Sequence, residues 1–274
     1  MLISPLVLLA GLVFIIALAM LAIKARAIDT SGGLAGIAIT FVTFVAGGPS
    51  WLVIVVVFFV GSSILTRFRY DYKVKLGSAQ EKGGTRSWPN TVANGGVAAL
   101  LAVAEVASHR DIFVIGFLTS VAAALADTVA TEVGLLSRSK PRLITDIRRF
   151  VAAGTSGGVS SLGEGASIAS AFVIVGLGGL LSIIGGSSGI PIVPAAVSIV
   201  VGAIAGTTFD SLLGATIEAT RKCVVCAAYT QSAYHHDRET VLIKGSKYVD
   251  NNMVNVLGII GGVVVGVLLY VLLR

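Results

Sequence analysis

The sequence predicts an all-α membrane protein, a polytopic bundle of about seven to eight transmembrane helices. Of its 274 residues, 55% are hydrophobic and only 12% are charged, whereas about 25% are charged in a typical soluble domain. The mean hydropathy is +0.93, and apolar runs of membrane-spanning length recur along the whole chain. A transmembrane β-barrel would instead show short alternating segments. We therefore expect a single integral-membrane domain over residues 1–274.

The apolar runs mark the expected membrane-spanning helices. The first begins at Ser4 and ends at Ile23, just before Lys24 and Arg26. It lacks a basic leader and is longer than the apolar core of a signal peptide, so we expect it to remain as a span. The further expected spans cover residues 34–46, 51–65, 92–108, 112–127, 166–184, 190–209 and 253–273.

Most of the twenty Lys and Arg residues gather in four segments. Two follow the first span, six lie in 66–86, five in 138–149 and five in 221–247. With eight spans, all four segments fall on one side, which the positive-inside rule makes the cytoplasm, and both termini face outward. Topology and anionic lipid headgroups would explain this basic face without a binding site. Nucleic acid is disfavoured as a partner, because no basic domain with interleaved aromatic residues is present.

Two aspartates stand near the ends of apolar helices. Asp127 shares a helix face with Thr131, one turn later, and Glu132 follows on a neighbouring face. Asp210 lies on a face with glycine at every fourth residue, which predicts close helix packing. Carboxylates in a membrane need protein, water or a cation around them. We expect Asp127 and Asp210 to share one site suited to Mg²⁺, although either could be a structural aspartate with satisfied hydrogen bonds.

Two glycine-rich loops have features of phosphate-binding segments. Gly83 and Gly84 lie between Lys82 and Arg86, where exposed backbone N–H groups and two cations suit an oxyanion. The segment 154–160 is the richest in glycine and hydroxyl residues, and it suits phosphate or metal-bound water. Neither loop is a Walker A motif. Helix capping and close helix packing are the alternative explanations.

Two further polar groups leave alternatives open. The last span begins with Asp250, Asn251 and Asn255, and a helix cap explains one of these side chains better than it explains all of them. Cys223 and Cys226, the only cysteines, form a CxxC motif that is followed by His235 and His236. This spacing could bind zinc, but a single CxxC motif is weak evidence, so metal binding stays an open question.

These motifs resemble those of the integral-membrane phytyl-phosphate kinase family, also known as the transmembrane protein 19-like family. The resemblance is carried by Lys-Gly-Gly-Thr-Arg-Ser-Trp-Pro-Asn-Thr-Val-Ala-Asn-Gly-Gly at 82–96, by Asp-Thr-Val-Ala-Thr-Glu-Val-Gly at 127–134, and by segments 141–145, 154–160, 210–214 and 250–255. The motifs occur in order across most of the chain. Two departures are Asn90, where relatives more often carry Gln, and residues 235–237, where the family carries further cysteines.

The resemblance implies an enzyme that uses CTP and Mg²⁺ to phosphorylate a prenyl monophosphate, giving a prenyl diphosphate and CDP. The acceptor would be phytyl phosphate, geranylgeranyl phosphate or a prenyl phosphate of similar length. Asp127, Asp210, Lys82 and Arg86 would be catalytic, and the metal would be held by Asp127, Thr131, Glu132 and Asp210. Nucleotide and phosphate binding would involve Gly83, Gly84, Asn94, Arg142, Gly154, Thr155, Ser156, Gly157, Gly158, Ser160, Ser211, Asp250, Asn251 and Asn255.

Two rival functions remain. A cytidylyltransferase acting on a lipid phosphate would use the same residue types but release pyrophosphate. A transporter of anionic or isoprenoid substrates would place Asp127 and Asp210 in broken helices near the middle of the bilayer. The polar motifs are concentrated on one face, and this favours an enzyme over a transporter.

Overall fold

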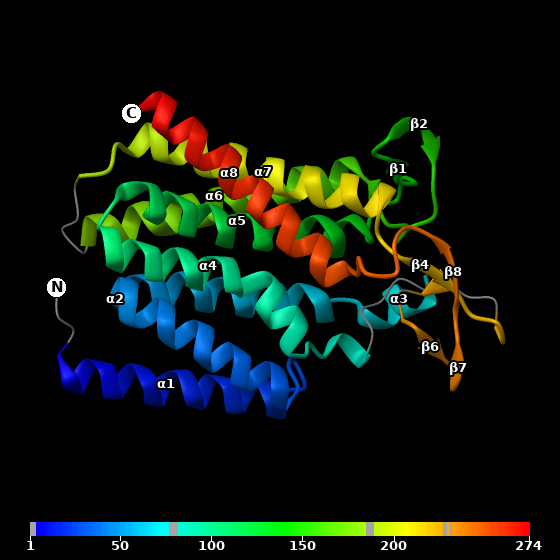
Figure 1. Ribbon diagram of the computed structural model, residues 1–274, viewed down its shortest axis with the longest axis horizontal. Helices are drawn as coiled ribbons and strands as arrows, with labels where there is room; N and C mark the ends of the chain where they lie inside the picture. The colour runs from blue at the N-terminus through cyan, green and yellow to red at the C-terminus, as the bar shows by residue number, and fades with distance from the viewer. Residues whose placement is uncertain (1–3, 77–81, 185–188, 227–228, 231) are drawn as a thin grey trace.

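The computed structural model describes residues 4–76, 82–184, 189–226, 229–230 and 232–274. Seven helices in these ranges are long and apolar enough to cross a membrane. They lie side by side along the long axis of the molecule (Figure 1). The prediction of a polytopic helical bundle is therefore confirmed. The seven helices are α1 (Pro5–Lys24), α2 (Thr30–Arg67), α4 (Trp88–Ser108), α5 (Asp111–Gly134), α6 (Ser161–Ile184), α7 (Ile192–Thr216) and α8 (Asn251–Leu273).

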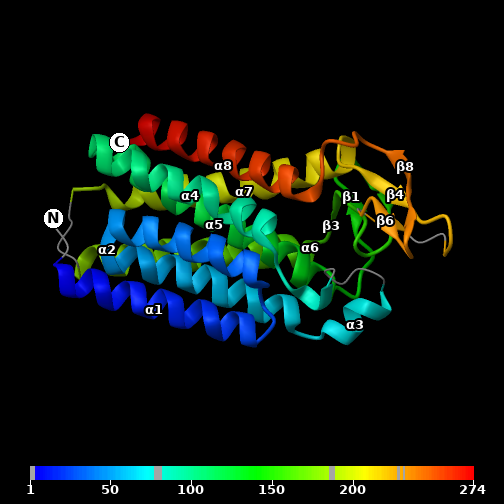
Figure 2. The same ribbon diagram turned by 60° about the horizontal axis from the view of Figure 1, so that its bottom comes forward.

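Helix α2 turns back on itself at Gly48 and Pro49. Its 38 residues would measure about 57 Å if the helix were straight, nearly twice the thickness of the hydrocarbon core of a bilayer. Gly48 has φ 67° and ψ −160°, a conformation that interrupts the helix and favours glycine. The two arms of α2 consequently run in opposite directions (Figures 1 and 2).

Contacts of Arg86 confirm that both ends of α2 lie at one end of the bundle. The backbone N–H of Arg86 donates to the carbonyl oxygen of Ala27 at 3.0 Å, just before α2 begins. The Arg86 guanidinium donates to Ser62 Oγ at 2.9 Å, near the end of α2. The expected spans 34–46 and 51–65 are therefore the two arms of α2, and the described helices traverse the bundle eight times.

The start of α1 and the end of α8 both lie at the end of the bundle opposite to the long loops (Figure 1). The long loops carry the short helix α3 (Tyr70–Lys75), the 3₁₀ turn η1 (Lys82–Gly84) and all the described strands (Figure 2). Four segments rich in Lys and Arg, which follow α1, α2, α5 and α7, reach this same end. We name this end of the bundle the loop end. An eight-pass arrangement explains this separation, because every second connection returns to the same side.

Helix α5 forms the centre of the bundle and packs against α2, α4, α6, α7 and α8. Residues 119–126 of α5 are all buried, and six of these eight are Ser, Ala or Thr, small enough for neighbouring helices to approach closely. Helices α7 and α8 approach through glycines: a Cβ atom on Gly262 would lie 2.5 Å from the carbonyl oxygen of Gly202. The predicted close packing of the glycine face of α7 is confirmed.

Small sheets at the loop end were not predicted. At 138–149 the sequence indicated only a segment rich in Lys and Arg, but residues 142–159 form an antiparallel sheet of order β2-β1-β3. Residues after α7 form a second sheet of order β5-β4-β8 and the hairpin β6–β7. The strands are β1 (Arg142–Leu143), β2 (Asp146–Phe150), β3 (Gly158–Val159), β4 (Thr220–Lys222), β5 (Tyr229–Thr230), β6 (Tyr234–His235), β7 (Arg238–Glu239) and β8 (Val241–Lys244).

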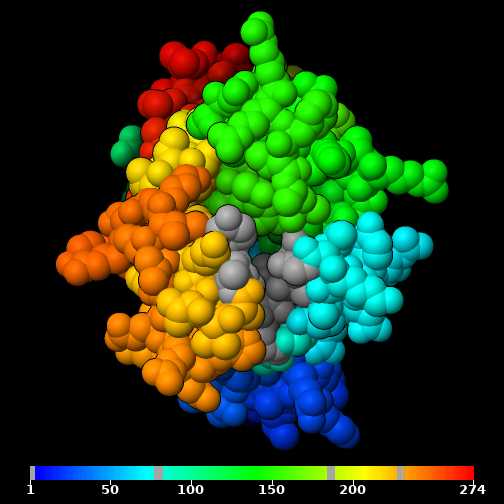
Figure 3. Space-filling model, turned by 90° about the vertical axis from the view of Figure 1, so that its right-hand side faces the viewer, coloured from blue at the N-terminus to red at the C-terminus, as the bar shows by residue number. Residues whose placement is uncertain are grey.

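The strands and α3 surround the centre of the loop end. Figure 3 shows three groups on this face: the α3 segment, the β1–β3 segment and the β4–β8 segment. They come from three separate parts of the chain, and they bring the polar motifs of the sequence onto one face.

Candidate functional site

Four carboxylates from three elements gather near the loop end, and we name them the carboxylate cluster. Asp127 of α5 interacts electrostatically with Glu164 of α6 and with Glu218, which follows α7. Asp210 of α7 interacts with Asp127 and Glu218. Asp127 and Asp210 stand seven and six residues before their helices end at Gly134 and Thr216. The structure thus brings the two predicted aspartates together, within about two helical turns of the loop end.

Helix α8 orients Asp210. With its side-chain amide turned to satisfy both neighbours, Asn255 donates to Asp210 Oδ2 at 3.0 Å and to the carbonyl oxygen of Asn251 at 3.1 Å. Close approach of the helices makes this possible, because a Cβ atom on Gly258 would lie 3.1 Å from Asp210 Cβ. Asp250 is the N-cap of α8 and accepts a hydrogen bond from the backbone N–H of Met253 at 2.9 Å. The capping alternative therefore explains the placement of Asp250 but not that of Asn255.

The glycine loop 154–158 packs against the end of α7. Ser156 Oγ donates a hydrogen bond to Glu218 Oε2, which joins this loop to the carboxylate cluster. Gly157 has φ +77°, and a side chain there would collide with Ala215. A Cβ atom on Gly214 would lie only 2.5 Å from Ser156 Oγ. Two glycines are thus needed for the loop to reach the helix, in accord with both the packing and the phosphate interpretations.

Ser160 directly precedes α6. Its Oγ accepts a hydrogen bond from the backbone N–H of Gly163 at 3.1 Å, and it lies beside Gly134 at the end of α5. Gly163 has no space for a side chain, because a Cβ atom would lie 2.6 Å from the carbonyl oxygen of Ala130. This tight junction of α5 and α6 holds Glu164 near Asp127.

Arg86 is half-buried and forms a second polar centre. Its Nη1 donates to Ser62 Oγ at 2.9 Å and its Nη2 to Thr66 Oγ1 at 3.3 Å. Burial lowers the pKa of the Arg86 guanidinium from its ordinary value, and the nearby carboxylate of Glu132 partly offsets this effect. Because that ordinary value is far above neutrality, Arg86 is a fixed cation held inside the protein.

Glu132 lies in a different environment from the carboxylate cluster. Its Oε2 is 2.6 Å from Nζ of Lys73, and both side chains are buried. Lys73 also donates to the carbonyl oxygen of Leu65 at 2.7 Å, so the pair fastens α3 to α2 and α5. Thr131, the other proposed ligand on this turn, is exposed. The structure brings Glu132 to Arg86 and Lys73, and its suggested metal role remains a prediction without a supporting contact.

The other predicted residues are distributed around the loop end. Arg142 is exposed, donates to the carbonyl oxygen of Ile147 at 2.8 Å and stacks on the ring of Phe150.

The remaining predicted residues lie in loops or near the ends of elements. Gly83, Gly84 and Gly154 have positive φ, and Thr155 is exposed. The backbone of Gly158 is in β3, and Ser211 is half-buried on α7 beside Asp210. Lys82 begins η1, but its side chain lies outside the described part of the chain.

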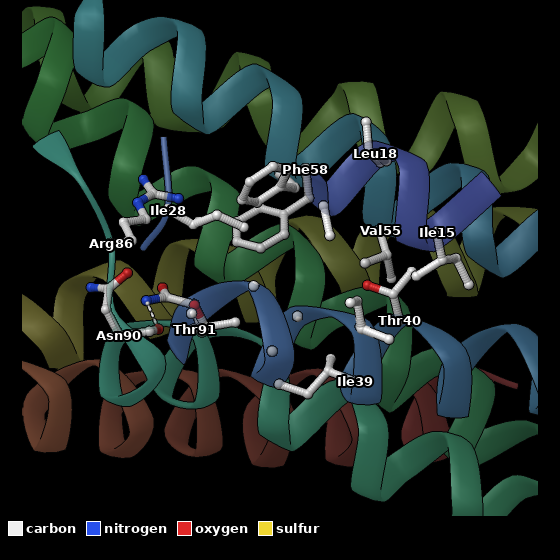
Figure 4. A pocket seen from close by; sticks show the side chains of 18 of the residues that line it. Ile15, Leu18, Ile28, Ile39, Thr40, Val55, Phe58, Arg86, Asn90 and Thr91 are labelled. Carbon is white, nitrogen blue, oxygen red and sulfur yellow. Dashed lines mark hydrogen bonds between the residues drawn. The ribbon is translucent and has the colours of Figure 1, made fainter. Parts of the chain in front are cut away.

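A largely apolar pocket lies inside the bundle between α1, both arms of α2, α4 and α5. Arg86, Asn90 and Thr91 lie at one end of it (Figure 4). Ile15, Leu18, Thr40 and Val55 lie toward the other end (Figure 4). Asn94 lines the pocket as well and donates to the carbonyl oxygen of Asn90 at 2.9 Å. The arrangement places the cation of Arg86 at one end of an apolar space, which suits an apolar group with an anionic head.

The two cysteines and His235 also come together. Cys223 follows β4, Cys226 lies in the next turn, and His235 belongs to β6. Backbone N–H groups, that of Cys226 first, lower the pKa of the Cys223 thiol to about 6, and a hydrogen bond with His235 acts in the same direction. This group lies outside the carboxylate cluster.

Glu164 and Glu218 are the site residues that the sequence interpretation missed. Glu218 stands eight residues after Asp210 and continues the face with glycine at every fourth residue, so helical spacing contained a signal for it. Glu164 follows Gly163 in the first turn of α6, and only the packing of α6 on α5 shows that it approaches Asp127.

The fold and site together define a polytopic helical membrane protein with a group of partly buried carboxylates toward one end. The chain belongs to a family described as the integral membrane protein family DUF92, whose sequence model matches residues 13–272. The resemblance to the integral-membrane phytyl-phosphate kinase family is confirmed at the level of the family. No solved structure matches the chain significantly.

Relatives occur in archaea and plants. The chain is 30% identical to the membrane protein MJ0933 of Methanocaldococcus jannaschii, over 95% of this chain and 93% of that protein. It is 31% identical to Protein PGR of Arabidopsis thaliana, over 86% and 87% of the two chains. It is 27% identical to Protein VTE6, chloroplastic, of the same plant, over 88% of this chain and 65% of that protein.

Proposed function

We propose that this protein is a phosphotransferase that moves the γ-phosphate of CTP to a membrane-bound prenyl monophosphate, with Mg²⁺ as the metal. The products are a prenyl diphosphate and CDP. The observation that carries this proposal is the meeting of Asp127 and Asp210, from two helices, beside the glycine loop 154–158. The relationship to the family supports an activity related to prenyl-phosphate kinases in general. CTP, Mg²⁺ and the prenyl acceptor belong to the proposal.

The donor set of the carboxylate cluster fits Mg²⁺. All four side chains offer oxygen atoms, which this hard cation prefers, and carboxylates that repel one another inside a membrane protein are stabilised by compensating positive charge or protons. Asp127 and Asp210 would hold the metal, and Asn255 would keep Asp210 in one orientation. When bound, Mg²⁺ neutralises charge on the nucleotide phosphates and aligns them for transfer.

The chain itself supplies positions for both phosphate groups. The loop 154–158 presents hydroxyls and backbone N–H groups beside the carboxylates and suits the nucleotide phosphates. Arg86 lies at the polar end of the pocket and suits the phosphate of the acceptor, whose apolar tail would occupy the space between α1, α2 and α4. The acceptor phosphate is already an anionic nucleophile, so the transfer requires no general base.

The continuous helices favour an enzyme over a transporter. Helices α5 and α7 have no interruption at Asp127 or Asp210, and both aspartates stand on the loop-end side of their helix centres. Transporters of the broken-helix type place their charged residues at interruptions near the middle of the membrane.

A labelling experiment tests the reaction. Purified protein in detergent is incubated with Mg²⁺, geranylgeranyl monophosphate and CTP labelled at either the γ- or the α-phosphate. The proposal requires γ-label in the lipid diphosphate and α-label in CDP. Entry of the α-label into lipid, with release of pyrophosphate, would identify a cytidylyltransferase instead. Transfer from neither position to any prenyl phosphate, in a preparation that is folded, would reject both enzymes.

A further inference from the structure

The loop after α7 brings two sulfur atoms and one imidazole nitrogen into a group. The ligand atoms of Cys223, Cys226 and His235 all lie within 4.8 Å of one another. Sγ of Cys226 is 3.6 Å from Nδ1 of His235. These distances are close to those between ligands on a tetrahedral zinc ion, since zinc–sulfur bonds of about 2.3 Å separate two sulfurs by less than 4 Å.

The turn around Cys223 is already shaped for a metal. Its Sγ accepts hydrogen bonds from the backbone N–H of Val225 at 3.3 Å and of Cys226 at 3.5 Å. Such bonds point two donors at one sulfur, which favours a thiolate over a neutral thiol and fixes its direction. Cys223 is buried at 2% exposure, while Cys226 is exposed, so a metal ion could reach the group from solvent.

The hairpin β6–β7 beside this group is short. Strands β6 and β7 contain two residues each, whereas an isolated two-stranded hairpin is marginal in water even when it is longer. His236 and Asp237 form the turn of this hairpin, both with positive φ, as two-residue hairpin turns require. A metal ion bound by His235 on β6 and by the cysteines after β4 would join this hairpin to the second sheet.

We propose that Cys223, Cys226 and His235 bind one zinc ion, which fastens the hairpin β6–β7 to the sheet β5-β4-β8. Two thiolates and one imidazole are the ligands that select zinc, and a water molecule or another ligand completes the tetrahedron. The role is structural. Strand β4 begins two residues after Glu218, so the zinc also steadies the segment that joins the carboxylate cluster to the loop end.

Metal analysis of the purified full-length protein tests the site. We expect about one zinc per chain by mass spectrometry, and loss of most of it in Cys226→Ser and His235→Gln. His236→Gln is the matched control, because His236 is adjacent but belongs to the hairpin turn, and it should retain zinc. With Co²⁺ in place of zinc, the wild type should show thiolate-to-cobalt absorption that Cys226→Ser lacks. Absence of metal in the wild type, or equal loss in all three variants, would overturn the proposal.

Hydrogen exchange provides a readout that needs no substitution. Removing the metal with a chelator should speed amide exchange in residues 220–244 and leave the sheet of residues 142–159 unchanged, because metal binding and local folding are coupled. Equal exchange before and after chelation in residues 220–244 would exclude the structural role. A disulfide between Cys223 and Cys226 in protein purified without oxidant would exclude zinc binding as well.

Discussion

Lys73 of α3 and Glu132 of α5 form an ion pair with an Nζ to Oε2 distance of 2.6 Å, and both side chains are buried. The pair connects a short helix of the loop end to the central helix of the bundle. Removing one charge would leave the other buried without its ion-pair partner, which costs about 3–5 kcal/mol in other proteins. The pair therefore offers a test of whether Glu132 has a structural or a metal-binding role.

We predict that Lys73→Met and Glu132→Leu each lower the unfolding temperature in detergent, and that the double variant recovers most of the loss, because an apolar pair can replace a buried ion pair. The double variant should also show more kinase turnover than either single variant. A double variant that is stable but inactive would instead support a direct role for Glu132 in metal binding.

Asp127→Asn and Asp210→Asn should each reduce turnover by roughly 10²-fold or more, because each removes charge from a site that stabilises transferring phosphoryl oxygens. Both substitutions preserve side-chain shape, so the unfolding temperature should change little. Asp111→Asn is the matched control, since Asp111 lies in the first turn of α5 at the opposite end. Near-normal turnover in both cluster variants would contradict the shared metal site.

Asn255→Leu should affect the same step indirectly. It removes the hydrogen bond to Asp210 Oδ2 and should raise the Mg²⁺ concentration needed for half-maximal activity more than it lowers the rate at saturating Mg²⁺. A titration of activity against Mg²⁺ measures both quantities. An unchanged Mg²⁺ requirement with a lower maximal rate would show that Asn255 does not act through the metal.

Arg86→Ala should impair catalysis strongly, and Arg86→Lys should restore only part of the loss. A lysine cannot reach Ser62 and Thr66 with two separate donors, as the guanidinium does. Arg67→Ala and Arg69→Ala are the controls for summed loop charge and should be nearly silent. Equal and mild effects of all three alanine substitutions would mean that the basic residues set membrane orientation only.

Gly36→Phe should reduce activity with long prenyl phosphates more than with short ones. Gly36 lines the apolar pocket, and a Cβ atom there meets only Thr91 Cγ2 at 3.8 Å, so the ring could enter the pocket. Gly61→Phe on the other arm of α2 adds the same bulk where a Cβ atom would meet nothing within 4 Å. The ratio of kcat/KM for geranylgeranyl and isopentenyl phosphates measures the effect, and equal ratios in both variants would argue against this pocket as the tail site.

The bundle could be predicted because membrane-spanning length and apolar composition are local properties of the sequence. The small strands could not, because strands of two to five residues depend on partners distant in sequence. For α2, hydropathy located both arms, but the reversal depends on the conformation of Gly48, which leaves no hydropathy signal. The grouping of Asp127 with Asp210 followed from their similar distances to helix ends.

The neighbours of each charged side chain were harder to predict. Helical spacing placed Glu132 close to Asp127 along α5, yet Lys73, fifty-nine residues earlier in the chain, takes it as a partner. Glu164 reaches the cluster only because Gly134 and Gly163 allow α5 and α6 to touch. Such contacts depend on how each helix is rotated about its axis and on the angle at which helices cross, and neither can be predicted from a single sequence.

The reversal of α2 at Gly48 also decides the sidedness of the whole chain. Because α2 returns to the end where it began, the described helices cross an even number of times, and the start of α1 and the end of α8 share the face opposite to the carboxylate cluster (Figure 1). In sealed vesicles, an impermeant reagent should therefore label tags on both termini from one compartment, and react with the exposed thiol of Cys226 only from the other. A reporter protein fused to either terminus would face away from the compartment that the carboxylate cluster and Cys226 face.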